Sequence, residues 1–247
     1  MTLLNVFILF LVSGCFLQLS FITCDSHGYM KSAVLLKGLA SFCFAGCGLI
    51  AFLFLLDRYN GDFIYPILVC FGLIAGAVGD IALGIRHTLK KGSIPYHGSF
   101  LLGIVCFLGG HVFYLASAII NLEQWFICVP IAVVCALIFV YFFFKILKAK
   151  PIYKIVGTVY VCILFSFVFC SVGKVIECIA EGIVLDTAPG LAVFLIAVAS
   201  IVFTISDILT VYNAFGPKKH PTMRLFSLSL YYAAQIVIAS SLLFLVN

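Results

Sequence analysis

The stretch IYPILVCFGLIAGAVGDIALGI at residues 64–85 decides the fold class. It contains a single charged side chain, Asp80, and a helix of this length spans about 33 Å, enough to cross the hydrocarbon core of a bilayer. A carboxylate at membrane depth is costly unless it is paired, neutralised or hydrated. The stretch therefore predicts a transmembrane helix that carries part of a functional site.

The rest of the chain has the same apolar character. Of its 247 residues 65% are hydrophobic and 9% are charged, and the mean hydropathy is +1.29. A soluble domain of this size would have too little polar surface to present to water. We therefore expect an all-α, polytopic transmembrane bundle, a single integral-membrane domain over residues 1–247. Eight apolar stretches are long enough to span a bilayer; they lie at residues 2–23, 33–56, 64–85, 99–119, 126–145, 152–173, 188–212 and 223–246.

The basic residues divide unevenly between the two sets of connections. Of the fourteen Lys and Arg residues, twelve fall in the odd-numbered connections and their flanking helix ends, and two in the even-numbered ones. The positive-inside rule places the odd-numbered connections in the cytosol and both termini on the non-cytosolic side. The first stretch has no positively charged segment before it, so we interpret it as a true helix rather than a signal peptide. The net charge of +5 reflects topology and indicates no nucleic-acid partner.

A second acid, Asp207, lies inside the apolar stretch FTISDILTVYN at residues 203–213. Its helix runs in the same direction as that of Asp80, and both acids are predicted about 7–8 Å from the cytosolic ends of their helices. Polar side chains expected in the same half of the bundle are Lys37, His111, Tyr114, Tyr160, Tyr231 and Gln235. One shared polar site explains this convergence better than scattered residues do.

Small residues share one face of the helix with Asp80. Gly72, Gly76, Asp80 and Gly84 recur every four residues, and the first two form a small-xxx-small pair that allows helices to approach closely. Packing explains the glycines but does not require an acid. Asp80 is therefore expected to face the bundle interior.

Three kinds of chemistry remain open from the residues alone. Two carboxyl groups in an apolar site tend to share protons, so that one can act as an acid at neutral pH in a hydrolase. Asp80, Asp207 and His111 could instead ligate a metal, although no HExxH motif is present. A transporter or channel could use the two acids to bind a proton or cation. A serine hydrolase is not indicated, because no GxSxG motif occurs.

Six motifs resemble, in order, those of the YhhN family of eight-helix membrane proteins, and within it the animal lysoplasmalogenase branch. They are LLKG at 35–38, AGAVGDIALG at 75–84, FLLGIVCFLGGHVFYLASA at 100–118, VYVCILF at 159–165, FTISDILTVYNAF at 203–215 and YYAAQIVIASS at 231–241. This resemblance implies hydrolysis of the vinyl ether bond of lysoplasmalogens to a fatty aldehyde and a glycerophospho-base. It also implies residence in the endoplasmic reticulum.

The resemblance implies a set of site residues as well. Asp80 and Asp207 match the two principal acids of the family. The residues that match its other polar motif positions are Lys37, His111, Tyr114, Tyr160, Ser206, Asn213, Tyr231, Tyr232 and Gln235. No cofactor or resident metal is expected, and the partners expected are a lysophospholipid substrate and the surrounding membrane lipids.

The expected reaction needs a carboxylic acid to protonate the vinyl ether carbon and a carboxylate to stabilise the cation and orient water. One of Asp80 and Asp207 would be the acid and the other the base, and the sequence does not decide between them. His111 and Tyr231 would orient water or the glycerol oxygen. Basic residues of the cytosolic rim would either attract the phosphate or serve topology alone; with Lys37 they are Lys90, Lys91, Lys218, Lys219 and Arg224. The alternative is a lipid-binding or transport protein that uses the same two acids as a proton or cation site.

Overall fold

A computed structural model describes residues 2–56, 58–59, 61–120 and 122–246. In this part of the chain the backbone forms eight long helices, a short terminal 3-10 helix and no strand. The helices are α1 Leu3–Ser26, α2 Met30–Leu55, α3 Ile64–Arg86, α4 Ile94–Ile120, α5 Trp125–Ile146, α6 Pro151–Ala180, α7 Ala188–Phe215 and α8 Pro221–Ser241, followed by η1 Leu242–Leu245. Each of the eight is long and apolar enough to cross a membrane, which confirms the predicted all-α membrane bundle.

Several helices continue beyond the apolar stretches that predict them. Helix α6 reaches Ala180 rather than ending at 173, and its last turns contain an ion pair between Lys174 and Glu177. A pair at this i, i+3 spacing stabilises a helix. Helix α4 begins at Ile94 rather than 99, with Pro95 in its first turn, where a proline is tolerated. Polar and charged residues at helix ends are excluded from the bilayer core but not from the helix, so hydropathy underestimates helix length.

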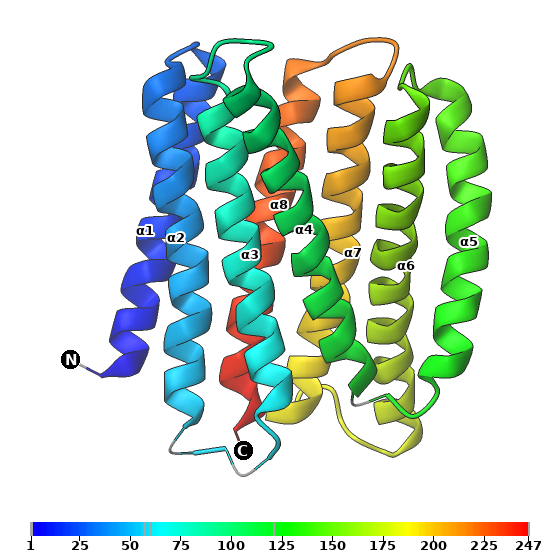
Figure 1. The fold of residues 1–247 in the computed structure, drawn as a ribbon. Helices are drawn as coiled ribbons and strands as arrows, with labels where there is room; N and C mark the ends of the chain where they lie inside the picture. Colours follow the sequence, from blue (N-terminus) through cyan, green and yellow to red (C-terminus); the bar gives the residue numbers. More distant parts are fainter. Residues whose placement is uncertain (1, 57, 60, 121, 247) are drawn as a thin grey trace.

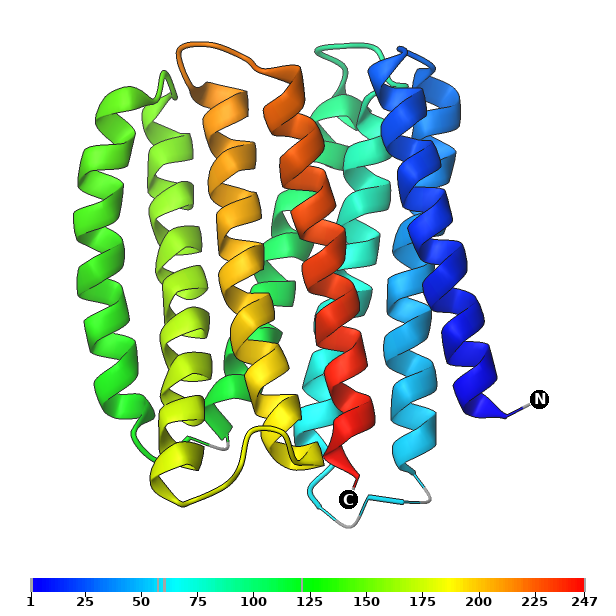
Figure 2. The ribbon, with the colours of Figure 1, turned by 180° about the vertical axis from the view of Figure 1, so that it is seen from behind.

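The helices form one bundle with two peripheral members (Figures 1 and 2). Helix α5 lies at one edge against α6, and α1 lies at the other edge against α2 and α8. Between them α3 packs along α4, α7 packs along α8, and α2 contacts both α3 and α8. The interior enclosed by these central helices holds the polar side chains considered below.

The connections at residues 27–29, 87–93, 147–150 and 216–220 lie together at one end of the bundle, which we name the basic end (Figure 1). Both termini lie at the opposite end (Figure 1). The two sets of connections thus separate as the charge pattern requires. The assignment of the basic end to the cytosol stays a prediction.

Candidate functional site

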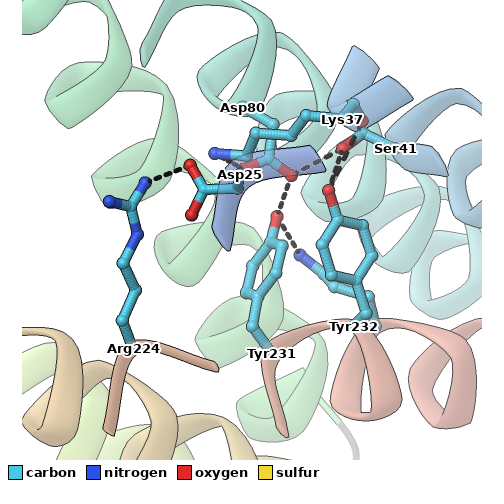
Figure 3. A network of polar contacts seen from close by, with 8 residues as sticks. Asp25, Lys37, Ser41, Asp80, Arg224, Tyr231 and Tyr232 are labelled. Carbon is cyan, nitrogen blue, oxygen red and sulfur yellow. Dashed lines mark hydrogen bonds and ion pairs between the residues drawn. The ribbon is translucent and has the colours of Figure 1, made fainter. Parts of the chain in front are cut away.

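Asp80 is the centre of a buried polar network (Figure 3). The Lys37 ammonium Nζ lies 2.8 Å from Asp80 Oδ1. The hydroxyls of Ser41 and Tyr231 donate to Asp80 Oδ2 at 2.6 and 2.8 Å. Only 2% of the Asp80 side chain is exposed. The carboxyl group of Asp80 thus accepts from three donors, one of which is charged.

Three helices contribute to this network for simple geometric reasons. Lys37 and Ser41 are four residues apart on α2, so both point from the same face toward α3. Tyr231 comes from α8, which packs against α2. Ser41 is missing from the sequence prediction, although its spacing from Lys37 is a signal that could have indicated it.

The network extends from Asp80 across α8 to α4. Gln235 Nε2 donates to the Tyr231 hydroxyl at 3.3 Å, and the Tyr114 hydroxyl donates to Gln235 Oε1 at 2.6 Å. On the other side, the Tyr232 hydroxyl lies 3.2 Å from Ser41 Oγ (Figure 3). These contacts unite four predicted site residues, and they give each buried polar group a partner, as burial requires.

Two glycines on α3 make room for this extension. A Cβ atom at Gly72 would overlap the ring of Tyr114, and one at Gly76 would lie 2.7 Å from Gln235 Nε2. The glycine stripe therefore does more than bring helices together, because it admits two side chains of the polar network.

Replacing Gly72 by alanine is expected to destabilise the protein by about 1–3 kcal/mol, because the added methyl overpacks the interior against Tyr114. The measurement is the thermal unfolding midpoint in detergent. Gly109→Ala is the matched control, since no atom lies within 4 Å of the new Cβ there. Alanine favours the helix by about 1 kcal/mol at an open position. Equal midpoints for the two variants would contradict the close approach of Tyr114 to α3.

Asp207 belongs to a second, smaller network. The Tyr160 hydroxyl donates to Asp207 Oδ2 at 2.5 Å, and His111 Nε2 lies 3.7 Å from the same oxygen. His111 Nδ1 lies 2.7 Å from the carbonyl oxygen of Phe107. A carbonyl only accepts, so Nδ1 carries the hydrogen and neutral His111 presents a lone pair on Nε2. That buried nitrogen makes no hydrogen bond within the described residues, and it faces Asp207.

The ring of Phe203 lies between the two networks. Its centroid is 4.6 Å from the ring of His111 and 5.3 Å from the ring of Tyr231, with both pairs edge to face. Within the part of the chain that the structure describes, no hydrogen bond joins one network to the other. The two acids are therefore close neighbours in the bundle but have separate sets of partners.

The depths of the two acids are similar and slightly greater than predicted. Asp80 lies six residues before Arg86, at the end of α3, and Asp207 lies eight residues before Phe215, at the end of α7. These spacings correspond to about 9 and 12 Å along the helices. The difference from the predicted 7–8 Å arises because both helices continue further toward the basic end.

The profile of the YhhN family matches residues 32–242. The chain belongs to the YhhN family. The YhhN match contains every residue of both networks and leaves α1 outside. No curated protein and no solved structure matches the chain.

Two residues at YhhN motif positions lie outside both networks. The Ser206 hydroxyl donates to the carbonyl oxygen of Ser227 at 2.7 Å and so joins α7 to α8. Asn213 Oδ1 accepts from the backbone N–H of His220 at 2.8 Å, which closes the turn between the same helices. Both side chains make structural contacts, and neither is directed at an acid.

A metal site on Asp80, Asp207 and His111 was one interpretation of the sequence. Among the described residues no three His, Cys, Asp or Glu side chains gather closely enough to hold an ion. Asp80 Oδ1 is instead occupied by the ammonium of Lys37. The donor arrangement is suited to proton chemistry, with one ion-paired carboxylate and one carboxyl group beside an imidazole.

Proposed function

We propose that this YhhN protein is a lysoplasmalogenase-like hydrolase, which cleaves the vinyl ether bond of 1-alkenyl lysophospholipids to a fatty aldehyde and a glycerophospho-base. The family supports a membrane hydrolase of this kind. The observation that carries the proposal is the contrast between the two acids. Asp80 is ion-paired with Lys37, whereas Asp207 faces the lone pair of His111.

In the proposed reaction a proton is added to the β-carbon of the vinyl ether, which leaves an oxocarbenium ion. Water adds to the cation and loses a proton, and the resulting hemiacetal collapses to aldehyde and alcohol. The first step needs a carboxylic acid, and the cation it produces is stabilised by a nearby carboxylate. Two acids with different partners divide these roles.

Asp207 is the better acid. When His111 is neutral, its Nε2 lone pair and the Asp207 oxygen 3.7 Å away are both acceptors, and protonation of the carboxyl group removes their repulsion. Among the described residues, Tyr160 alone donates a hydrogen bond to the Asp207 side chain, of which 17% is exposed. It is therefore more accessible to a substrate than Asp80.

Asp80 is the better stabiliser of positive charge. Its three donors hold both oxygens in place before a cation forms, so no reorganisation is needed at that moment. Neutral His111 keeps its Nε2 lone pair directed at Asp207 and so favours the protonated carboxyl group there. Lys37 and Tyr231 act by positioning Asp80.

The proposal includes a location. With the basic end in the cytosol and both termini on the other side, the site would open toward the cytosolic leaflet of an endoplasmic-reticulum-type membrane. The substrate would reach it from the lipid phase, with the phosphate at the basic end.

The test is aldehyde release by the purified protein in detergent, with 1-alkenyl, 1-alkyl and 1-acyl lysophospholipids as parallel substrates. Only the 1-alkenyl lipid is expected to react, because only its carbon–carbon double bond can be protonated to give the cation. A chelator is added as a control and is expected to leave turnover unchanged. If the folded protein releases no aldehyde from either choline or ethanolamine lipids, the proposed hydrolase activity is contradicted, and lipid binding or transport is favoured.

A further inference from the structure

A small pocket lies at the basic end, where α1, α2, α3 and α8 meet. Its volume is about 50 Å³. A water molecule needs about 10–15 Å³ of such space, so the pocket holds a few waters or one group the size of a phosphate, and no lipid chain. Its lining includes Phe21, Asp25, Lys37, His87, Arg224 and Leu228.

Two cationic side chains line this pocket. Lys37 is the residue that also pairs with Asp80, so the pocket adjoins the Asp80 network. Arg224, in the first turn of α8, donates from Nη2 to Asp25 Oδ1 at 2.8 Å (Figure 3). Only 12% of the Asp25 side chain is exposed, against 45% of Arg224. A carboxylate of the protein itself thus lines the pocket and pairs with one of its two cations.

The surroundings of His87 indicate a positive potential at the same place. Partial burial lowers the pKa of His87, and the charges of Arg224, Lys37 and Arg86 lower this pKa further, against the opposing effect of Asp25. His87 is therefore neutral at pH 7, and its ring can form hydrogen bonds with a group bound in the pocket. The cationic charge of the pocket comes from Lys37 and Arg224.

We propose that this pocket binds a phosphate group, that of the lysophospholipid, and that the phosphate replaces Asp25 as the partner of Arg224. The proposal rests on the proposed function for the source of the phosphate. A guanidinium offers two parallel N–H donors that match phosphate oxygens. Only the glycerol carbons separate phosphate from the ether oxygen in a lysophospholipid, so a phosphate near Lys37 places the ether bond beside Asp80.

The basic residues of the rim fall into two groups, those that line the pocket and those that do not. Lys37 and Arg224 line it, whereas the other predicted phosphate-attracting residues, Lys90, Lys91, Lys218 and Lys219, do not. The phosphate is recognised by two particular cations and is opposed by one particular acid, Asp25. Because Asp25 and the phosphate compete for Arg224, removing the acid and removing the cation have opposite effects on binding.

The test measures binding of an uncleavable 1-alkyl lysophospholipid to the full-length protein in mixed micelles, beside 1-alkylglycerol, which lacks the phosphate, and inorganic phosphate. Arg224→Gln is expected to weaken binding of the lysophospholipid at least about tenfold, since a hydrogen bond to a charged group is lost. Asp25→Asn is expected to tighten it severalfold. Arg224→Lys keeps the charge without the paired donors and should fall between wild type and Arg224→Gln.

The controls separate the contribution of the phosphate group to binding from that of the alkyl chain. Binding of 1-alkylglycerol should not change in any variant, and Lys148→Gln, an exposed cation of the basic end outside the pocket, should bind all three probes as wild type does. Inorganic phosphate should compete with the lysophospholipid in wild type and lose this effect in Arg224→Gln.

Weaker binding in both Asp25→Asn and Arg224→Gln, or no change in either, would overturn the proposal and leave the ion pair a structural link between α1 and α8. An equal loss of 1-alkylglycerol binding would also overturn it. Arg224-dependent binding of inorganic phosphate without binding of the lysophospholipid would overturn the lipid as the source. Since the readout is binding, intact Arg224-dependent binding without aldehyde release would reject the hydrolase and retain the phosphate pocket.

Discussion

Asp207→Asn is expected to lower turnover of a 1-alkenyl lysophospholipid by about 10²–10⁴-fold, the usual contribution of a general acid. Asparagine keeps the size of the side chain and an oxygen that can accept from the Tyr160 hydroxyl. It removes the carboxyl proton facing His111. Binding of the uncleavable 1-alkyl lysophospholipid should therefore change by less than about tenfold, which is below 1.4 kcal/mol.

The measurement pairs aldehyde release with lipid binding on the same purified sample. Asp186→Asn is the matched control, because it makes the same chemical change at an exposed acid of the opposite end. A lipid sensor or uncoupled carrier would tolerate loss of the proton at position 207, so this variant also separates the two classes of function. Retention of more than about a tenth of wild-type turnover would show that another group donates the proton.

Separating Lys37 from Asp80 is expected to have the largest effect on stability. Asp80→Asn leaves the ammonium without its anion, and Lys37→Met leaves a carboxylate that is only 2% exposed without its cation. Removing one partner of a buried ion pair costs about 3–5 kcal/mol. The double variant Lys37→Met/Asp80→Asn removes both charges and should recover much of this loss in stability, but it should not recover turnover.

A double-mutant cycle on the thermal unfolding midpoint measures the coupling. The ion pair of Lys174 and Glu177, at the opposite end, is the control cycle, since a pair near a helix end is expected to couple by less than about 1 kcal/mol. Aldehyde release is recorded for every variant. If the decreases in unfolding midpoint caused by Lys37→Met and Asp80→Asn add up in the double variant, the two side chains do not stabilise each other.

The architecture was largely predictable, because a membrane span is a property of consecutive residues. A run of about twenty apolar residues identifies a helix whatever its neighbours are. The helix ends were less predictable, as α6 shows, because its last turns continue past the apolar stretch and contain charged residues such as Lys174 and Glu177.

The site was predictable as a collection of residues but not as an arrangement. Both acids stood out because a charge in an apolar helix is costly. The two acids look alike in the sequence, since each lies in an apolar helix at a similar predicted depth. Their partners in the structure differ: Asp80 pairs with Lys37, and Asp207 lies beside Tyr160 and His111. These pairings depend on which helices are neighbours, which no local pattern encodes. The same limit explains why Ser206 and Asn213 could not be distinguished from residues that contact the acids.

Phe203 lies between the hydrogen-bond network of Asp80 and that of Asp207, which bears on how a proton can be transferred within the site. Hydrolysis of a vinyl ether consumes water and releases no net proton, so the proton given to carbon is regained from the water that attacks the cation. With no hydrogen bond across Phe203 in the described chain, Asp80 is not placed to return that proton to Asp207. Under the proposed reaction, Asp207 donates the proton at the start of each cycle and accepts one at its end, while Asp80 keeps its ion pair with Lys37.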